Sequence, residues 1–251
     1  MGEKYWDEIG DNYDREIFDT LAGARTRVIV DHIDRCSSPT ATACDFGCGV
    51  GKYVATLGKK FRSVYAIDIS RKLLEQSKKS NRKVSNVVYL KGDLANPSVD
   101  AGPVHFALNV NVLIMASVTR RRRILDNIFR QIRKRGHLLL VVPSLESALF
   151  AHFRLVDWNM KAGVKRANPA SDTLTGTNSR MFPLRTGVLN INGAPTKHYL
   201  KEELIVLLSD VGFTIRSIAK VEYPWKSEFV RPPKWMKEPY PWDWLFLCQK
   251  S

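Results

Sequence analysis

The chain has 251 residues, of which 44% are hydrophobic and 25% are charged, and its formal net charge is +14. This hydrophobic content excludes a disordered chain, and no apolar run is long enough to span a bilayer. A charge this positive favours anionic partners such as RNA, acidic lipids or acidic substrates, or else it describes a solvated surface.

Length and cysteine content narrow the class further. A chain of this length fits one large α/β domain, with or without an insertion. Residues 1–14 are acidic and polar, which is unlike a signal peptide. Cys36, Cys44, Cys48 and Cys248 show neither metal-ligand spacing nor a disulfide framework. We therefore expect no metal site and a reducing, cytoplasmic location.

The first segment, residues 1–35, is predicted to form helices that cap the domain. Apolar residues follow helical spacing from Ile17 to Ile33. Trp6 and Tyr13 precede this stretch among acidic residues. Aromatic side chains at such positions most simply anchor a helix in the core.

Three alternate glycines, Gly47, Gly49 and Gly51, follow a short apolar strand that ends near Cys44, and a helix follows them. Glycines so placed let the chain turn sharply and let a ligand approach bare backbone at the start of a helix. A dinucleotide fingerprint would need glycine where Lys52 stands. A phosphate loop would need glycine in place of Phe46. The corner therefore predicts another nucleotide-like ligand.

The acid and glycines of this corner, Asp45, Gly47, Gly49 and Gly51, resemble the first motif of the class I S-adenosylmethionine-dependent methyltransferases. The resemblance implies S-adenosylmethionine as the cofactor, with Cys48 lining the turn. Members of this family also carry an aromatic cap over the cofactor. Trp6 and the Tyr13–Asp14 pair resemble that cap.

Two further strands are each followed by an acid. The strand at 63–67 precedes Asp68, about 20 residues past the glycines, where a carboxylate can accept the ribose hydroxyls. Asp68 is alternatively a helix cap, although Ser70 can serve that role. Ile69 would pack on the adenine. The strand at 86–91 precedes Asp93, which could be an ordinary turn residue. The resemblance implies instead that Asp93 accepts a hydrogen bond from the adenine amino group and that the Leu94 amide contacts the ring.

The fourth strand, 104–110, brings Asn109 and Asn111 toward the methionine part of the cofactor, as the resemblance implies. Ile114 and Met115 then stand where many members have a polar residue, which predicts an apolar wall. An amphipathic helix follows at 119–134, with Gly136 as its cap and its arginines, Arg120–Arg123 among them, on the outer face. The fifth strand is predicted at 137–142.

This alternation predicts an α/β fold with a doubly wound, mostly parallel seven-stranded sheet, and ligand residues at the carboxyl ends of the strands. We expect one methyltransferase domain over 1–251, with its cofactor-binding core at 36–143. A lid insertion after the fifth strand occupies 144–199, with a helix over 145–164, a polar loop over 168–179 and a strand over 187–192 followed by a turn. Residues 200–251 supply a last helix and two last strands, and residues 226–240 form a fixed loop between them that serves as either a site rim or a dimer contact.

The leading functional interpretation is in-line methyl transfer to the oxygen or nitrogen of a small molecule. If a base is required, His198 before the last helix and His152 in the lid are the candidates, although lone histidines are more often structural. Methylation of RNA (tRNA or rRNA) is the alternative favoured by charge, but the basic helix lacks interleaved aromatics. A non-catalytic cofactor-binding subunit is the third. The oligomeric state stays open.

Overall fold

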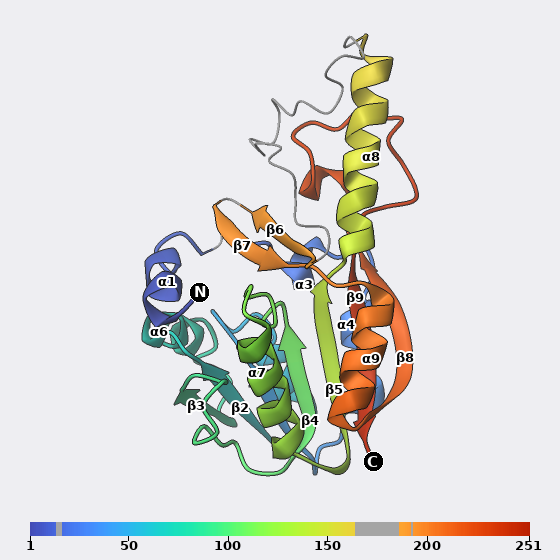
Figure 1. Cartoon of the computed structure of the whole chain (residues 1–251). Coiled ribbons are helices and arrows are strands. Elements are labelled where there is room, and N and C mark those ends of the chain that lie inside the picture. Colours follow the sequence, from blue (N-terminus) through green and yellow to red (C-terminus); the bar gives the residue numbers. More distant parts are fainter. Residues whose placement is uncertain (14–16, 164–185, 192) are drawn as a thin grey trace.

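The computed structural model describes residues 1–13, 17–163, 186–191 and 193–251 (Figure 1). Within these ranges the main sheet has seven strands in the order β3-β2-β1-β4-β5-β9-β8. All pairings from β3 to β5 are parallel, and β9 is antiparallel to both of its neighbours. The predicted doubly wound, mostly parallel seven-stranded sheet is therefore confirmed. The strands are β1 (Thr42–Phe46), β2 (Ser63–Asp68), β3 (Val87–Lys91), β4 (Val104–Val110), β5 (Ile132–Pro143), β8 (Phe213–Glu222) and β9 (Trp242–Lys250).

Helices cover both faces of this sheet (Figure 1). One face packs against α4 and α5, and the other against α7 and α9. The helices are α1 (Glu3–Ile9), α3 (Thr20–Gly23), α4 (Val28–Cys36), α5 (Val54–Lys60), α6 (Arg71–Ser80), α7 (Val118–Gln131), α8 (Leu145–Lys161) and α9 (Lys201–Val211), with a 3-10 turn, η1, at Trp225–Ser227.

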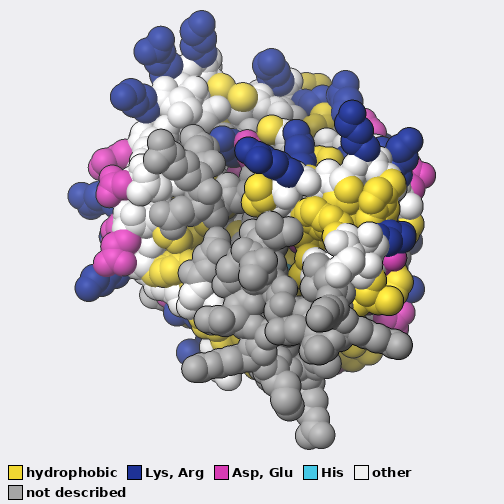
Figure 2. Space-filling model, turned by 90° about the horizontal axis from the view of Figure 1, so that it is seen from above, with side chains coloured by type: hydrophobic (Ala, Val, Ile, Leu, Met, Phe, Trp, Pro, Cys, Tyr) yellow, Lys and Arg dark blue, Asp and Glu magenta, His cyan; other side chains and the backbone are white. Residues whose placement is uncertain are grey.

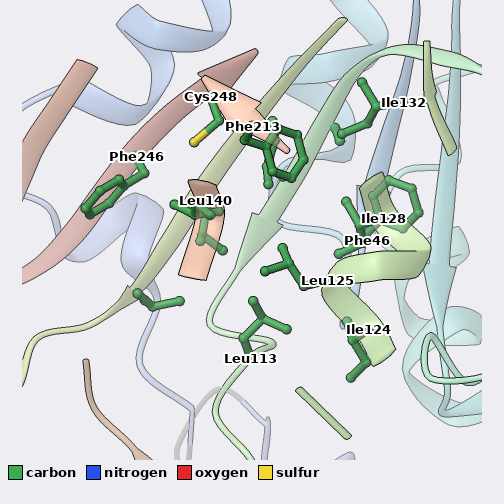
Figure 3. Packing of buried hydrophobic residues seen from close by; sticks show 14 of the residues in the cluster. Phe46, Leu113, Ile124, Leu125, Ile128, Ile132, Leu140, Phe213, Phe246 and Cys248 are labelled. Atoms are coloured by element: carbon green, nitrogen blue, oxygen red, sulfur yellow. The ribbon is translucent and has the colours of Figure 1, made fainter. Parts of the chain in front are cut away.

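The larger core cluster lies between the sheet and helices α7 and α9 (Figure 3). Leu125 and Ile128 of α7 and Leu140 of β5 have no exposed surface. Each such side chain contributes roughly 1.5–3 kcal/mol through burial. Residues 138–142 of β5 are buried on both faces of the strand, as expected for the middle of an α/β sheet. This packing fixes the carboxyl ends of β1, β4 and β5 relative to one another.

The helix predicted at 119–134 ends earlier, because α7 stops at Gln131 and β5 begins at Ile132. Gly136 is therefore a strand residue, and its prediction as a helix cap is wrong. A Cβ atom at Gly136 would lie 3.0 Å from the His105 carbonyl oxygen, so glycine lets β5 approach β4 at an irregularity in their pairing. Arg121, expected on the outer face, is buried and donates to the carbonyls of Met115 and Ala116.

The apolar stretch predicted as helical from Ile17 to Ile33 is split between α3 and α4. The Asp19 side chain caps α3 by accepting from the amides of Leu21 and Ala22. Ala24 then adopts an extended conformation, and the Arg25 amide donates to the Glu222 carbonyl at 2.8 Å. This contact with β8 takes the backbone out of helical geometry between α3 and α4.

After β5 the chain forms α8, which projects beyond the sheet (Figure 1). Part of the segment 223–242 packs against it through a cluster of Ala151, Leu155, Trp225, Phe229 and Met236. A hairpin of β6 (Val188–Ile191) and β7 (Ala194–Lys197) follows, in place of the single strand expected there. The polar loop predicted at 168–179 lies outside the described residues. Gly212 ends α9 in a left-handed conformation.

No helix among the described residues is long and apolar enough to cross a membrane.

Candidate active site

A cavity of about 700 Å³ opens at the carboxyl ends of the parallel strands. This volume is in the range of small-molecule and cofactor sites. Most of the predicted site residues line it: Trp6, Tyr13, Asp45, Gly47, Cys48, Gly49, Asp68, Ile69, Asp93, Leu94, Asn111 and His198. Gly51, Asn109 and His152 do not.

The glycine corner connects β1 to α5 with all three glycines at positive φ: +83° at Gly47, +51° at Gly49 and +78° at Gly51. The amides of Gly47 and Cys48 donate to the Ile67 carbonyl at 2.8 and 2.9 Å, which fixes the corner to the end of β2. A Cβ atom at Gly49 would lie 2.6 Å from the Tyr13 hydroxyl. Only glycine fits there, so bare backbone is left at the floor of the cavity.

Gly51 serves packing rather than the cavity. A Cβ atom there would collide with the Ser77 hydroxyl and lie 2.7 Å from Asn81 Nδ2 of the α6 end. The Asn81 amide also donates to the Gly51 carbonyl at 3.1 Å. The third glycine therefore lets the corner sit directly against α6.

Asp68 lies at the carboxyl end of β2 and is buried. Its Oδ2 accepts from the Gly49 amide at 2.8 Å and its Oδ1 accepts from the Ser70 amide at 2.9 Å. Burial raises the pKa of Asp68, and these backbone donors oppose the increase. Ser70, not Asp68, caps α6 by accepting from the Leu73 amide. The Asp68 carboxylate thus holds the corner in shape and also faces the cavity.

Asp45 stands one residue before the end of β1 and is 3% exposed. Its Oδ2 has no hydrogen-bond partner among the described residues. Burial, and then the charge of Asp68, raise the pKa of Asp45 to about 7. An unpartnered carboxylate oxygen lining a cavity fits a ligand that brings a cation or a hydrogen-bond donor.

Asp93, after β3, forms an ion pair that the sequence analysis did not anticipate. Its Oδ2 accepts from Arg120 Nη2 at 2.8 Å, and its Oδ1 accepts from the Ala95 amide at 2.9 Å. Arg120 belongs to the first turn of α7 and lines the cavity, although the sequence analysis placed it on the outer face of the helix. Its position in the first turn after β4 is a signal that it lies near the ligand edge, because helices in such folds begin there.

The two aromatic residues of the predicted cap, Trp6 and Tyr13, line the cavity from the N-terminal segment. Helix α1, which carries Trp6, is attached to α6: Gln76 donates to the Gly10 carbonyl at 2.7 Å, and the Ser70 hydroxyl donates to the Asp7 carboxylate. Asp14 lies outside the described residues.

The two asparagines of the fourth strand differ in position. Asn109 is fully buried and donates from Nδ2 to the Phe46 carbonyl at 3.0 Å, so it ties β4 to the end of β1 and does not reach the cavity. Asn111 lines the cavity at φ 54° and donates from Nδ2 to Asp243 Oδ2 at 3.4 Å. The buried Asn111 Oδ1 has no partner among the described residues.

The two histidine candidates lie in different parts of the structure. His198 lines the cavity, and its Nδ1 lies 3.1 Å from the Thr196 carbonyl oxygen, which makes Nδ1 the protonated nitrogen and Nε2 an acceptor. Burial lowers the pKa of His198 to about 4, so the ring is neutral near pH 7. His152 is exposed on α8, next to the inward-facing Ala151, and a step of one residue turns a side chain by about 100° around a helix. His152 is therefore not part of this cavity.

Sequence reasoning did not name Tyr223 and Asp243, which also line the cavity, and it placed Glu228 only within the segment 226–240 that it offered as a site rim or a dimer contact. The Tyr223 hydroxyl donates to Asp243 Oδ2 at 2.9 Å. Asp243 pairs with Pro143 at the end of β5. Because β9 runs antiparallel, its first residues lie at the same edge as the last residues of the parallel strands. An acid at the start of an antiparallel last strand therefore lies at the ligand edge.

Comparisons with known proteins agree with this arrangement. Residues 44–140 match the sequence model of a family described as a methyltransferase domain. No match was found among curated protein sequences.

Solved structures share the fold at low sequence identity. A methyltransferase from Methanosarcina mazei has 17% identity and a TM-score of 0.60, covering 87% of this chain and 96% of its own. Magnesium protoporphyrin IX methyltransferase from Synechocystis, with bound S-adenosylhomocysteine, has 15% identity and a TM-score of 0.61, covering 99% and 97%. The N-methyltransferase NodS from Bradyrhizobium japonicum has 10% identity and a TM-score of 0.62, covering 99% and 98%.

The matched domain, the strand order and the glycine corner define an enzyme that transfers methyl groups. Residues 44–140 match a methyltransferase domain, the strand order is that of the S-adenosylmethionine-dependent methyltransferase fold, and S-adenosylmethionine is the methyl donor.

Proposed function

We propose that the protein methylates a small molecule, at oxygen or nitrogen, inside the cavity at the carboxyl edge of the sheet. The observation that supports this best is that one cavity contains both the glycine corner and a second set of walls. Those walls are apolar at Ile114 and Met115 and include Thr196 and His198 of the hairpin region. A lined chamber of this size suits a small acceptor.

The cofactor would be held by the residues that surround the corner. Asp68 would accept the ribose hydroxyls, and Ile69 and the Leu94 amide would contact the adenine. The unpartnered Asp45 carboxylate would accept a cationic or donor group of the methionine part. Asp93 would accept a hydrogen bond from the adenine amino group, through a carboxylate lone pair that the Arg120 contact leaves free. When bound, the donor supplies a methyl group already activated by its sulfonium charge.

The remaining contribution of the chain is to orient the acceptor and exclude water. Trp6 and Tyr13 would close the cavity over the cofactor, and Ser147, Thr196 and His198 would line the wall facing the acceptor. The neutral His198 ring would accept a hydrogen bond from the substrate through Nε2. With a pKa of about 4 it is a weak base, so it suits orientation better than removal of a tightly held proton.

Methylation of RNA has less support from the described residues. Arg121 is buried, Arg120 pairs with Asp93, and Arg122 pairs with Asp126, so much of the basic α7 helix is used within the protein. The names of two structural relatives, a porphyrin methyltransferase and an N-methyltransferase, also favour a small acceptor. The four cysteines are free, which fits the proposed cytoplasmic location.

The test is incubation of the purified protein with methyl-labelled S-adenosylmethionine and a cell extract separated into small-molecule and RNA pools. We expect label in the small-molecule pool. Label in RNA alone would refute the proposal. Binding of the donor without any transfer would instead favour a non-catalytic cofactor-binding subunit.

A further inference from the structure

The cavity has a charge opposite to that of the whole protein. The chain carries a formal charge of +14, and Figure 2 shows many Lys and Arg side chains around the margin of the face seen from above. Among the described residues that line the cavity, the bases are Lys52 and Arg120. The acids there are Glu8, Asp19, Asp45, Asp68, Asp93, Glu228 and Asp243.

The two bases leave most of these acids without a partner cation. Lys52 pairs with Asp19 at 3.2 Å, and Arg120 pairs with Asp93 at 2.8 Å. Asp45 and Asp68 belong to the glycine corner. Glu8 pairs with Lys4 at 4.0 Å. Glu228 and Asp243 are the remaining acids of the cavity, and no described Lys or Arg nitrogen lies within 4 Å of either.

Hydrogen bonding around Glu228 and Asp243 shows an excess of acceptors. Asp243 Oδ2 accepts from Tyr223 and Asn111, and Glu228 Oε1 accepts from the Ser227 hydroxyl at 3.4 Å. The buried Asn111 Oδ1, beside Asp243, has no partner among the described residues. A group that carries several N–H donors and no acceptor would satisfy this end of the cavity, and an ammonium is such a group.

We propose that Glu228 and Asp243 bind the cationic amine of the substrate, and that Glu228 takes up its proton before methyl transfer. This inference rests on the proposed function and narrows it to N-methylation of a primary or secondary amine. Glu228 is placed as the proton acceptor because it lines the cavity and is the more exposed of the two acids, whereas Asp243 is held by Tyr223 and Asn111.

The reaction balances without a further reactant. The ammonium gives one proton to the Glu228 carboxylate and becomes a neutral amine with a free lone pair. That lone pair bonds to the methyl carbon while the carbon–sulfur bond breaks, and the bonding electrons leave with sulfur as the thioether product. The methylated amine carries the positive charge that the sulfonium lost, and Glu228 returns its proton to solvent.

The electrostatics of the pair agree with this role. Although Glu228 is exposed as a residue, desolvation of its carboxyl group at the cavity, and then the charge of Asp243, raise its pKa to about 7; burial raises the pKa of Asp243 to about 6 while Tyr223 and Asn111 oppose it. These values bring the carboxyl groups close to neutral pH, where a general base works best. The other titratable groups around the pair are Tyr223 and Tyr53, whose raised pKa values keep them neutral.

The experiment extends the labelling assay by passing the labelled small-molecule pool over a cation exchanger and an anion exchanger. We expect a labelled product, separate from the unreacted donor, that the cation exchanger retains and that is absent when the enzyme is omitted. Glu228→Gln should lower its formation about 10- to 100-fold, since a charged hydrogen bond and a proton acceptor are lost. Binding of S-adenosylhomocysteine, measured by calorimetry, should stay close to the wild-type value.

Glu238→Gln is the matched control, because Glu238 belongs to the same segment but is 76% exposed and does not line the cavity. It should label at the wild-type rate. Asp243→Asn, if it folds, should behave like Glu228→Gln. Absence of a labelled cationic product overturns the amine proposal. Label in neutral or anionic small molecules would leave the proposed function standing, whereas label in RNA alone would remove both.

Discussion

Replacing Asp68 by Asn tests the proposed cofactor site most directly. The Asp68 carboxylate accepts from the amides of Gly49 and Ser70 through its two oxygens, at 2.8 and 2.9 Å. An asparagine has one oxygen and so can accept from only one of these amides. Its NH₂ group faces the other as a second donor. The substitution therefore removes the negative charge and opens one of the two contacts that shape the corner.

The size of the effect follows from these contacts. A hydrogen bond to a charged group contributes about 1.5–3 kcal/mol, so losing the charged contact to the ribose should raise the cofactor Kd about 10- to 150-fold. One buried amide also loses its acceptor, which should lower the free energy of unfolding by about 1–3 kcal/mol.

Calorimetric titration with S-adenosylhomocysteine measures the Kd, and urea denaturation measures the stability. Asp100→Asn is the control, because Asp100 accepts from the Gly102 amide at 2.8 Å in an exposed loop away from the cavity. Its Kd should not change. A folded Asp68→Asn protein with wild-type affinity would show that Asp68 shapes the corner without contacting the cofactor.

Three more predictions concern the corner and the substrate wall. Gly51→Ala should lower the free energy of unfolding by about 2–5 kcal/mol, because of left-handed strain and a collision with Ser77. Gly102→Ala is the control, because Gly102 has φ +70° but open space around it, and it should cost only about 1–2 kcal/mol. Equal costs in urea denaturation would contradict the crowding argument. Because the pKa of Asp45 is about 7 in the free protein and a bound cation would lower it, cofactor binding near pH 7 should release protons and weaken as the pH falls below 7. Calorimetry in buffers of different ionisation enthalpy tests this, and buffer-independent heats would count against it. His198→Ala should lower turnover and leave the cofactor Kd unchanged; unchanged turnover would show that the ring only packs.

The parts predicted well from sequence depend on local rules. The acid and glycine corner could be identified from spacing because positive φ at alternate positions requires glycine. Asp68 and Asp93 could be placed because parallel strands bring their carboxyl ends to one edge.

What failed depends on contacts between distant segments. The helical period of residues 119–134 gave no sign that Ile132 would join the sheet opposite Val104. Nothing near His152 in the sequence tells which face of α8 meets the segment 223–242. Asp243 was missed because the strand order, which places β9 between β5 and β8, is needed to bring it to the site.

The placement of β9 also bears on how this protein acquires its structure. Before β9 pairs with it, β5 is the edge strand of a five-stranded sheet. The backbone N–H and C=O groups along one side of the buried stretch 138–142 then have no hydrogen-bond partner. The matched domain stops at residue 140, within β5. A fragment cut at that boundary would therefore expose an unpaired apolar edge strand and tend to aggregate, whereas in the chain that includes β9 this edge is hydrogen-bonded. Strand β9 therefore both covers the edge of the sheet and places Asp243 at the cavity.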